Sequence, residues 1–367
     1  MKVLILTIAD KRHMTMISPY IDYLEENHIE YDIIRANRYE KQQEYLSVTE
    51  HRLGKIYVLD MLIDIRTPKW KKLIPFLKFK FAASRLIIKN QYDYIIVWNE
   101  NSAAMFADIL ALKYKQRYCI NIRDEFDFLG IKQLVDLAMK YCHFFTCNSP
   151  EDKLLTSEKG ICLINHDTEL TKCWKRHDGF RGKNQPIRIT HLGFYSKTKK
   201  TADEMAEIFG NDTRFELYFY GNGFDDGYKK LIDSKGYKNI FVGGPFPYED
   251  TAIYLQNTDI INSYYNRGTE HEYNMSFGIK HSYTPLLYIP GLTDENTSWS
   301  RLSKPYNLTF LVNEKNRKTL ADDLYNWYRG LDYDTFCKNC DAFNEKYTFK
   351  SQRELANKLD GVLKTNA

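Results

Sequence analysis

Residues 187–289 contain the three stretches that decide the fold: IRITHLGFYSKTKK (187–200), FELYFYGNGFDDGYKKLI (215–232) and TDIINSYYNRGTEHEYNMSFGIKHSYTPLLYI (258–289). Each begins with a short strand of the buried type and passes through a glycine-containing or polar turn into a helical pattern. The third stretch then returns to a strand. Successive strand–turn–helix units predict a parallel sheet that is covered by helices.

The N-terminal half has the same rhythm, with helical patterns such as Ala103–Lys115 and Lys132–Lys140 between short apolar strands. We expect strands at Val3–Ile8, Tyr31–Arg35, Ile56–Leu62, Tyr94–Trp98, Tyr118–Ile122 and Phe144–Cys147.

A chain of 367 residues exceeds what one hydrophobic core usually serves, so two α/β domains are expected. We place them at 1–175 and 186–344, separated by a polar, basic segment from about Thr171 to Pro186. The C-terminal helix, about 345–367, is expected to pack back on the first domain.

Composition narrows the class of protein. Hydrophobic residues at 43% and charged residues at 27% are ordinary for a globular protein, and a net charge of +4 is too small to predict nucleic-acid binding. Seven cysteines without a framework spacing, and an opening MKVLILTIADKRH that is unlike a signal peptide, favour the cytoplasm. No apolar run is long enough to cross a bilayer.

Two turns in the second domain have residues suited to a diphosphate. Gly193 is followed by Lys197 and Lys199, before a helix that we expect to begin near Thr201, and Gly221-Asn222-Gly223 ends the next strand. Backbone N–H groups at a helix N-terminus and nearby cations favour phosphate. An exposed turn in a lysine-rich protein is the plainer interpretation.

The third stretch resembles the GT-B glycosyltransferases, particularly the family 4 type of bacterial capsule, exopolysaccharide and O-antigen synthesis. That family has a Glu-x7-Glu motif followed by Gly-x-Pro and a buried strand. Relative to Pro285, Glu270 stands at the first Glu, whereas Gly278 replaces the second and Tyr283 replaces the Gly. The resemblance implies that Glu270 lies beside the donor sugar as a catalytic residue. Asn274, one helical turn later, would reach the same ligand.

The first stretch resembles the family's Gly-Arg-x-x-x-x-Lys loop, with Phe194 in place of the Arg and Lys199 at the Lys. The resemblance implies the GT-B fold: two Rossmann-like, doubly wound domains facing each other across a cleft. It also implies a nucleoside-diphosphate sugar as donor, a lipid-linked saccharide as acceptor, a retaining reaction, and neither metal nor other cofactor.

In the first domain, polar residues follow two strands at the edge where an acceptor would face the donor. Asp10, Arg12 and His13 are the candidate acceptor-binding residues, and Arg123 and Asp124 are candidate catalytic residues. Arg123 would stabilise the charge on the departing diphosphate, and Asp124 or Asp10 would act as general base if the reaction inverts. A structural ion pair between Arg123 and Asp124 is the alternative.

Residues 69–89 form a basic amphipathic pattern. Trp70, Leu73, Leu77, Phe81 and Ile88 share one helical face, and Lys71, Lys78 and Arg85 recur on another. Such a helix can contact an anionic membrane at the inner face of the cell membrane, or it can simply pack on the sheet. Pro75 is expected to break its first turn.

Two other functions compete. A non-catalytic protein that binds sugar nucleotides or polysaccharide would also have half of the motif. A dehydrogenase fits less well, because the turn TIADKRH after the first strand is not GxGxxG.

Overall fold

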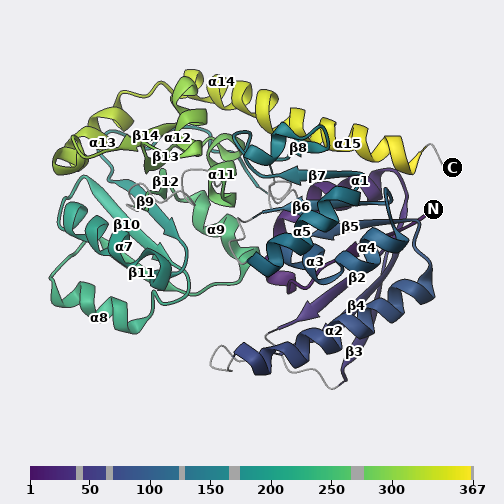
Figure 1. Cartoon of the computed structure of the whole chain (residues 1–367). Helices are drawn as coiled ribbons and strands as arrows, with labels where there is room; N and C mark the ends of the chain where they lie inside the picture. The colour runs from purple at the N-terminus through teal and green to yellow at the C-terminus, as the bar shows by residue number, and fades with distance from the viewer. Residues whose placement is uncertain (39–43, 63–68, 124–128, 165–173, 266–276, 365–367) are drawn as a thin grey trace. The chain divides into compact units, whose positions relative to one another are not determined.

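The computed structural model describes residues 1–38, 44–62, 69–123, 129–164, 174–265 and 277–364 of the chain. They form two compact units, which are Met1–Asp167 together with Ser351–Ala367, and Thr168–Lys350 (Figure 1). Each unit has its own sheet and its own hydrophobic core.

The first unit contains an eight-stranded sheet in the order β3-β4-β2-β1-β5-β6-β7-β8, in which only β3 is antiparallel. The strand order reverses between β1 and β5, as in a doubly wound sheet. The strands are β1 (Lys2–Leu6), β2 (Glu30–Asn37), β3 (Leu46–His51), β4 (Gly54–Asp60), β5 (Tyr94–Trp98), β6 (Tyr118–Ile122), β7 (Phe144–Cys147) and β8 (Gly160–Cys162).

The helices of the first unit are α1 (Ser18–Glu26), α2 (Lys69–Asn90), α3 (Glu100–Met105), α4 (Ala107–Lys113), α5 (Leu129–Tyr141) and α15 (Lys350–Leu363), with short 3-10 turns η1 (Lys11–His13), η2 (Thr15–Ile17) and η3 (Lys153–Thr156). Two expectations were wrong. The helix predicted at Ala103–Lys115 is two helices, because the backbone leaves helical geometry at the buried Phe106. Pro75 lies inside α2 without ending it.

The second unit contains a six-stranded, fully parallel sheet in the order β11-β10-β9-β12-β13-β14, which reverses between β9 and β12. The strands are β9 (Ile187–Leu192), β10 (Phe215–Tyr220), β11 (Ile240–Gly244), β12 (Ile260–Ser263), β13 (Gly291–Asp294) and β14 (Thr309–Val312). The two doubly wound α/β units confirm the predicted fold class.

The helices of the second unit are α7 (Tyr195–Phe209), α8 (Asp226–Ser234), α9 (Thr251–Gln256), α11 (Ile279–Leu287), α12 (Ser298–Ser303), α13 (Leu320–Arg329) and α14 (Tyr333–Phe343), with 3-10 turns η4 (Tyr248–Asp250), η5 (Lys304–Tyr306) and η6 (Arg317–Thr319) and a π-helical turn η7 (Asn344–Phe349). The stretch PLLYI, expected as a strand, continues α11 to Leu287. Tyr288 ends that helix in the left-handed conformation, and the strand follows from Gly291.

Candidate functional site

The carboxyl ends of β9 and β12 meet at the point where the strand order of the second unit reverses. In open α/β sheets, ligands bind outside the carboxyl ends of the strands at such a point. We call this region the carboxyl edge; it comprises Gly193 after β9, Gly221–Gly223 after β10, Tyr264 and Tyr265 after β12, and the starts of α7 and α11.

The glycines of the carboxyl edge allow two turns to touch. The N–H of Gly193 donates to the carbonyl of Tyr220 at 3.0 Å, and the N–H of Tyr195 donates to the carbonyl of Asn222 at 2.9 Å. A Cβ at Gly221 would lie 1.9 Å from the carbonyl oxygen of Gly193, and the φ of Gly221 is +128°. Glycine is therefore required there. The structure brings Gly193, Gly221, Asn222 and Gly223 together at the start of α7.

A buried histidine links the two central strands. Asn262 Nδ2 lies 3.0 Å from His191 Nδ1, and His191 Nε2 lies 3.1 Å from Thr198 Oγ1, which donates to the carbonyl of Phe194 at 3.0 Å. An Asn amide donates to Nδ1, so Nε2 carries the proton. Burial, with a smaller contribution from the Lys280 ammonium, holds the pKa of His191 well below its ordinary value. The neutral histidine therefore connects the first turn of α7, through Thr198, to β12, through Asn262.

Lys280 is the cation of the carboxyl edge. It is half-buried in the first turn of α11, its Nζ lies 3.3 Å from the carbonyl oxygen of Asn262, and its ammonium sits 4.6 Å from the centre of the Tyr265 ring. Among the described residues, no carboxylate lies within ion-pair distance of it. A lysine at a helix N-terminus is repelled by the positive end of the helix dipole. A bound anion would be attracted by both the ammonium and the dipole.

The lysines predicted after Gly193 lie elsewhere than expected. The helix α7 begins at Tyr195 and not near Thr201, so Ser196–Lys200 form its first turns. Lys199 is exposed, and Thr198 is engaged with His191. Lys197 also lies in this first turn, but its side chain falls outside the described part of the chain, as do the whole of Glu270 and Asn274.

The first unit has polar side chains at the matching edge of its own sheet, where β1 and β5 end. Trp98 Nε1 donates to the carbonyl of His13 at 3.2 Å, and the guanidinium of Arg123 lies 5.1 Å from the Trp98 ring centre. The N–H of Arg123 donates to Glu100 Oε2 at 3.3 Å, and the buried Asp10 accepts from the N–H of Arg38 at 3.2 Å. The structure thus groups Asp10, His13 and Arg123. The side chain of Arg12 and all of Asp124 lie outside the described residues.

Sequence reasoning missed Lys280, His191 and Glu100. One signal could have found Lys280, because helix N-termini favour acidic residues and a lysine there is unusual. His191 had no signal in the sequence, since its role depends on Asn262 and Thr198 meeting it in the fold. Glu100, which is buried, directly follows a strand and Asn99, a pattern that also fits a plain helix cap.

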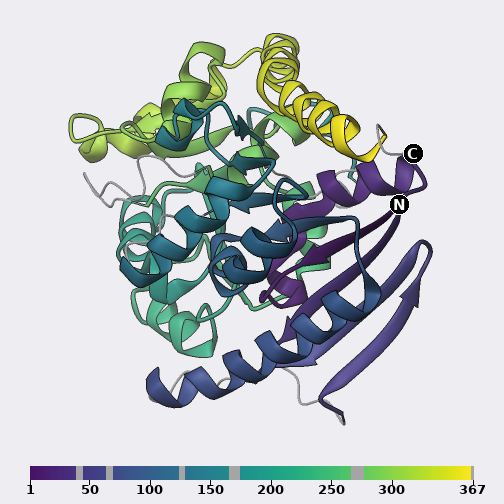
Figure 2. The same cartoon turned by 45° about the vertical axis from the view of Figure 1, so that its right-hand side comes forward.

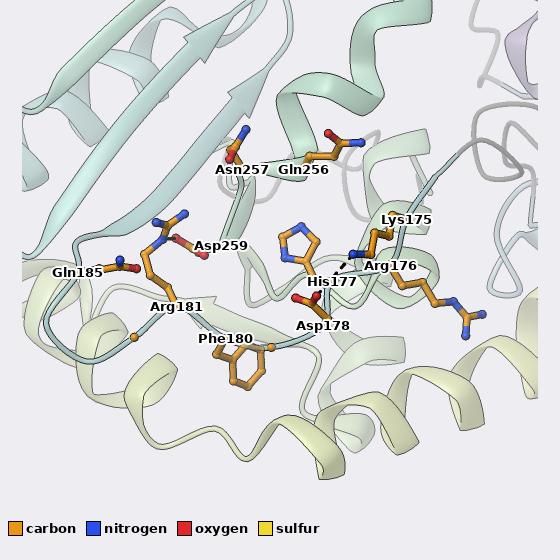
Figure 3. A pocket seen from close by; sticks show the side chains of 12 residues that line it. Lys175, Arg176, His177, Asp178, Phe180, Arg181, Gln185, Gln256, Asn257 and Asp259 are labelled. Carbon is orange, nitrogen blue, oxygen red and sulfur yellow. Dashed lines mark hydrogen bonds and ion pairs between the residues drawn. The ribbon is translucent and has the colours of Figure 1, made fainter.

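A second polar region lies at the opposite, amino edge of the same sheet. Residues 175–185 and the start of β12 enclose a pocket of about 500 Å³ (Figure 3). Its charges are paired: Arg181 with Asp259, Lys175 with Asp178 at 3.6 Å, and Arg176 with Asp341 at 3.9 Å. Burial raises the pKa of Asp259 more than the Arg181 guanidinium lowers it. This pocket has little charge left for a ligand.

No group of three or more His, Cys, Asp or Glu side chains that could hold a metal ion occurs in the part of the chain that the structure describes.

Solved structures share this architecture. Sucrose-phosphate synthase from Thermosynechococcus elongatus has a TM-score of 0.69 and 11% identity, with each chain fully covered. Anabaena Alr3699/HepE in complex with UDP has a TM-score of 0.66 and 14% identity over 98% of this chain and 100% of that one. A putative UDP-N-acetylglucosamine 2-epimerase from Listeria monocytogenes has a TM-score of 0.63 and 13% identity, covering 98% and 96%.

No family model matches the sequence, and no curated protein does either. The similarity to the solved structures shows the fold, which is the predicted GT-B fold of two Rossmann-like units.

Proposed function

We propose that the protein is a glycosyltransferase that takes a sugar from a nucleoside-diphosphate donor bound at the carboxyl edge of the second unit. The observation that carries the proposal is Lys280. Its half-buried ammonium has no carboxylate partner in the described residues and lies at the carbonyl of Asn262 on β12, the strand that pairs with β9 at the switch point of a doubly wound sheet. Structures of the same fold include one with UDP bound.

In this proposal, Lys280, Lys197, Lys199 and the α7 amides that follow Tyr195, whose own N–H donates to Asn222, receive the diphosphate. Glu270 and Asn274 orient the donor sugar, as the resemblance implies. When the bond between the anomeric carbon and the diphosphate oxygen breaks, its electron pair stays on that oxygen, and the cations stabilise the new charge. The proposed donor site requires neither a metal nor another cofactor.

The first unit would bind the acceptor through Asp10, Arg12 and His13. Arg123, whose guanidinium lies over Trp98, is the cation we assign to the departing diphosphate, with Asp124 as its catalytic neighbour. The acceptor hydroxyl forms the new glycosidic bond, and in a retaining reaction its proton passes to the leaving diphosphate oxygen.

We further propose that the acceptor is a lipid-linked saccharide of capsule, exopolysaccharide or O-antigen synthesis. Such an acceptor would place the protein in the cytoplasm at the inner face of the cell membrane, in contact with it through residues 69–89. The resemblance in residues 187–290 and the basic composition of 69–89 support this part.

A binding protein without catalysis remains the second candidate, because Gly278 replaces the second Glu of the motif. The fold is also shared by an epimerase, so the fold alone does not name the reaction. Product analysis separates the three: a transferase releases nucleoside diphosphate only with acceptor, an epimerase returns an altered sugar nucleotide, and a binding protein returns the donor unchanged.

The first experiment is a thermal-shift screen of nucleoside-diphosphate sugars. A ligand at one hundred times its dissociation constant should stabilise the protein by about 2.7 kcal/mol. Absence of stabilisation by every donor in the panel would contradict the proposal.

The second experiment is transfer by Glu270→Ala and Lys199→Ala, each of which should abolish turnover with the unfolding temperature unchanged. Lys230→Ala, an exposed lysine on α8, is the matched control. Wild-type turnover in both site variants would remove these assignments.

A further inference from the structure

The helix α2 has two apolar faces on opposite sides. Phe79, Ala83 and Ile87 are fully buried against the sheet, where α2 contacts β4. Leu73, Leu77 and Phe81 follow at intervals of one helical turn on the other side, and they are 57%, 43% and 66% exposed. Ile74 and Ile88 extend the same exposed surface. We call these five side chains the outer stripe.

The helix α2 does pack on the sheet, as one interpretation of the sequence expected, but through a different face from the predicted one. The apolar face of Trp70, Leu73, Leu77, Phe81 and Ile88 was expected either to pack on the sheet or to contact a membrane; the side chain of Trp70 lies outside the described residues. The rest of this face does not pack on the sheet, because different residues fill that role. Figure 2 shows α2 along the outside of the first unit, with one long side turned away from the strands.

The charges of α2 have a single sign. The helix has no acidic residue, and its basic residues are Lys69, Lys71, Lys72, Lys78, Lys80, Arg85 and Lys89. Lys80 pairs with Asp108 at 3.0 Å. Lys78, Arg85 and Lys89 are exposed and lie along one flank of the outer stripe, and none of them is within ion-pair distance of a carboxylate in the described part of the chain.

We propose that the outer stripe of α2 docks on an anionic lipid bilayer, with the helix lying in the plane of the interface. Apolar side chains would enter the boundary between headgroups and acyl chains, while Lys78, Arg85 and Lys89 meet the lipid phosphates. Charge complementarity selects this occupant, since a protein groove for this stripe would have to be acidic as well as apolar. No helix in the described residues is long and apolar enough to span a membrane, which agrees with a surface contact. The inference rests on the membrane contact proposed above and assigns it to named side chains, and its test depends on neither the donor nor the reaction.

The test is sedimentation of the full chain with phosphatidylcholine vesicles that contain or lack phosphatidylglycerol. The wild-type protein should bind only the anionic vesicles, and added salt should weaken the binding. Leu77→Ser/Phe81→Ser should lower the partition coefficient at least tenfold. Lys78→Gln/Arg85→Gln/Lys89→Gln should lower it about a hundredfold, because each basic residue near an anionic surface contributes about fivefold.

Two controls keep the result specific. Leu112→Ser removes an even more exposed leucine, 84% accessible, from α4 of the same unit. Lys229→Gln/Lys230→Gln/Lys238→Gln removes the same charge from the surface of the second unit. Both controls should bind vesicles as the wild type does. All substituted residues are exposed, so the unfolding temperature should not change.

Three outcomes would overturn the proposal. The wild-type protein could fail to bind anionic vesicles, the controls could lose as much binding as the stripe variants, or sedimentation equilibrium could show that Phe81→Ser dissociates a dimer of this chain. The last outcome would make the outer stripe an interface between copies.

Discussion

The two edges of the six-stranded sheet have similar residues and opposite electrostatics. The amino edge has Arg181, Arg176 and Lys175, each with a carboxylate partner. Figure 3 shows Arg181 beside Asp259 and Lys175 beside Asp178. The carboxyl edge has Lys280, whose ammonium meets a carbonyl and a tyrosine ring instead. Each edge also has a histidine, His177 or His191, whose pKa is lowered by burial.

The difference separates an edge whose cations are paired with carboxylates from the edge to which we assign the donor. At the amino edge the pair of Arg181 with Asp259 ties residues 175–185 to the start of β12, and the pairing of the cations leaves little charge for a ligand. Burying part of a cation without a carboxylate partner costs free energy, and a bound anion would offset that cost. The pocket of about 500 Å³ at the amino edge is therefore not the better candidate site.

The largest expected effect comes from a methyl group at the carboxyl edge. Gly221→Ala should destabilise the second unit by about 3 kcal/mol or more, because the Cβ collides with the carbonyl of Gly193 at a positive φ. At the amino edge, a Cβ added at Gly179 would meet no atom within 4 Å, and Gly179→Ala should be nearly neutral. Urea unfolding measures both. Equal stabilities would mean that the two turns are not in contact.

The charged residues of the two edges should respond in opposite ways. Arg181→Gln leaves the buried Asp259 with only the N–H of Arg188 at 2.8 Å, so it should lower stability by about 2 kcal/mol without weakening UDP binding. Lys280→Gln should keep stability but weaken UDP binding about tenfold, with uridine binding unchanged. Calorimetric titration measures the UDP affinity of both variants, and urea unfolding measures their stability. A loss of UDP affinity in Arg181→Gln alone would reverse the assignment.

Acid should destabilise the second unit through His191. Its pKa is depressed in the folded state, so below about pH 6.5 the unfolded chain binds a proton at this histidine and the folded chain does not. Stability is thus fully present above pH 6.5 and falls by up to about 1.4 kcal/mol per pH unit below it. His191→Asn, which keeps an acceptor for Asn262, should reduce the slope of unfolding free energy against pH by the amount that corresponds to about one bound proton. His177→Asn should flatten it less, and a slope unchanged by His191→Asn would show that the imidazole is not held neutral.

The smallest effect is expected at the rim of the amino-edge pocket. Lys175 and Asp178 are both more than three-quarters exposed, and an exposed pair contributes less than about 0.5 kcal/mol. Lys175→Gln should change neither stability nor UDP binding. A measurable loss of UDP affinity would indicate that this pocket, and not the carboxyl edge, receives the ligand.

Much of the fold could be predicted because local pattern and burial agree. Tyr94–Trp98, Tyr118–Ile122 and Phe144–Cys147 are strands with the predicted bounds, since each is a fully buried and mostly apolar run. The strand β3 was missed because it is an exposed hairpin partner with polar residues. The start of α7 was misplaced because Ser196 and Thr198 after a glycine suggested a turn, whereas here Thr198 is held in the helix by His191.

The candidate site was predictable only in part. Glycines after strands could be recognised from their spacing, and Gly193, Gly221 and Gly223 do lie together. Lys280 belongs to a helix distant in sequence from those turns, and only the pairing of β9 with β12 brings it close to them. The identity of the outward face of α2 also could not be read from periodicity, because both of its faces are apolar.

A crystal structure of the protein with bound UDP would test the assignment of the carboxyl edge most directly. We expect diphosphate density at the carboxyl edge, within hydrogen-bond distance of Lys280 Nζ and of the α7 amides that follow Tyr195. Density among Lys175, Arg176 and Arg181 at the amino edge, with the carboxyl edge empty, would contradict that assignment.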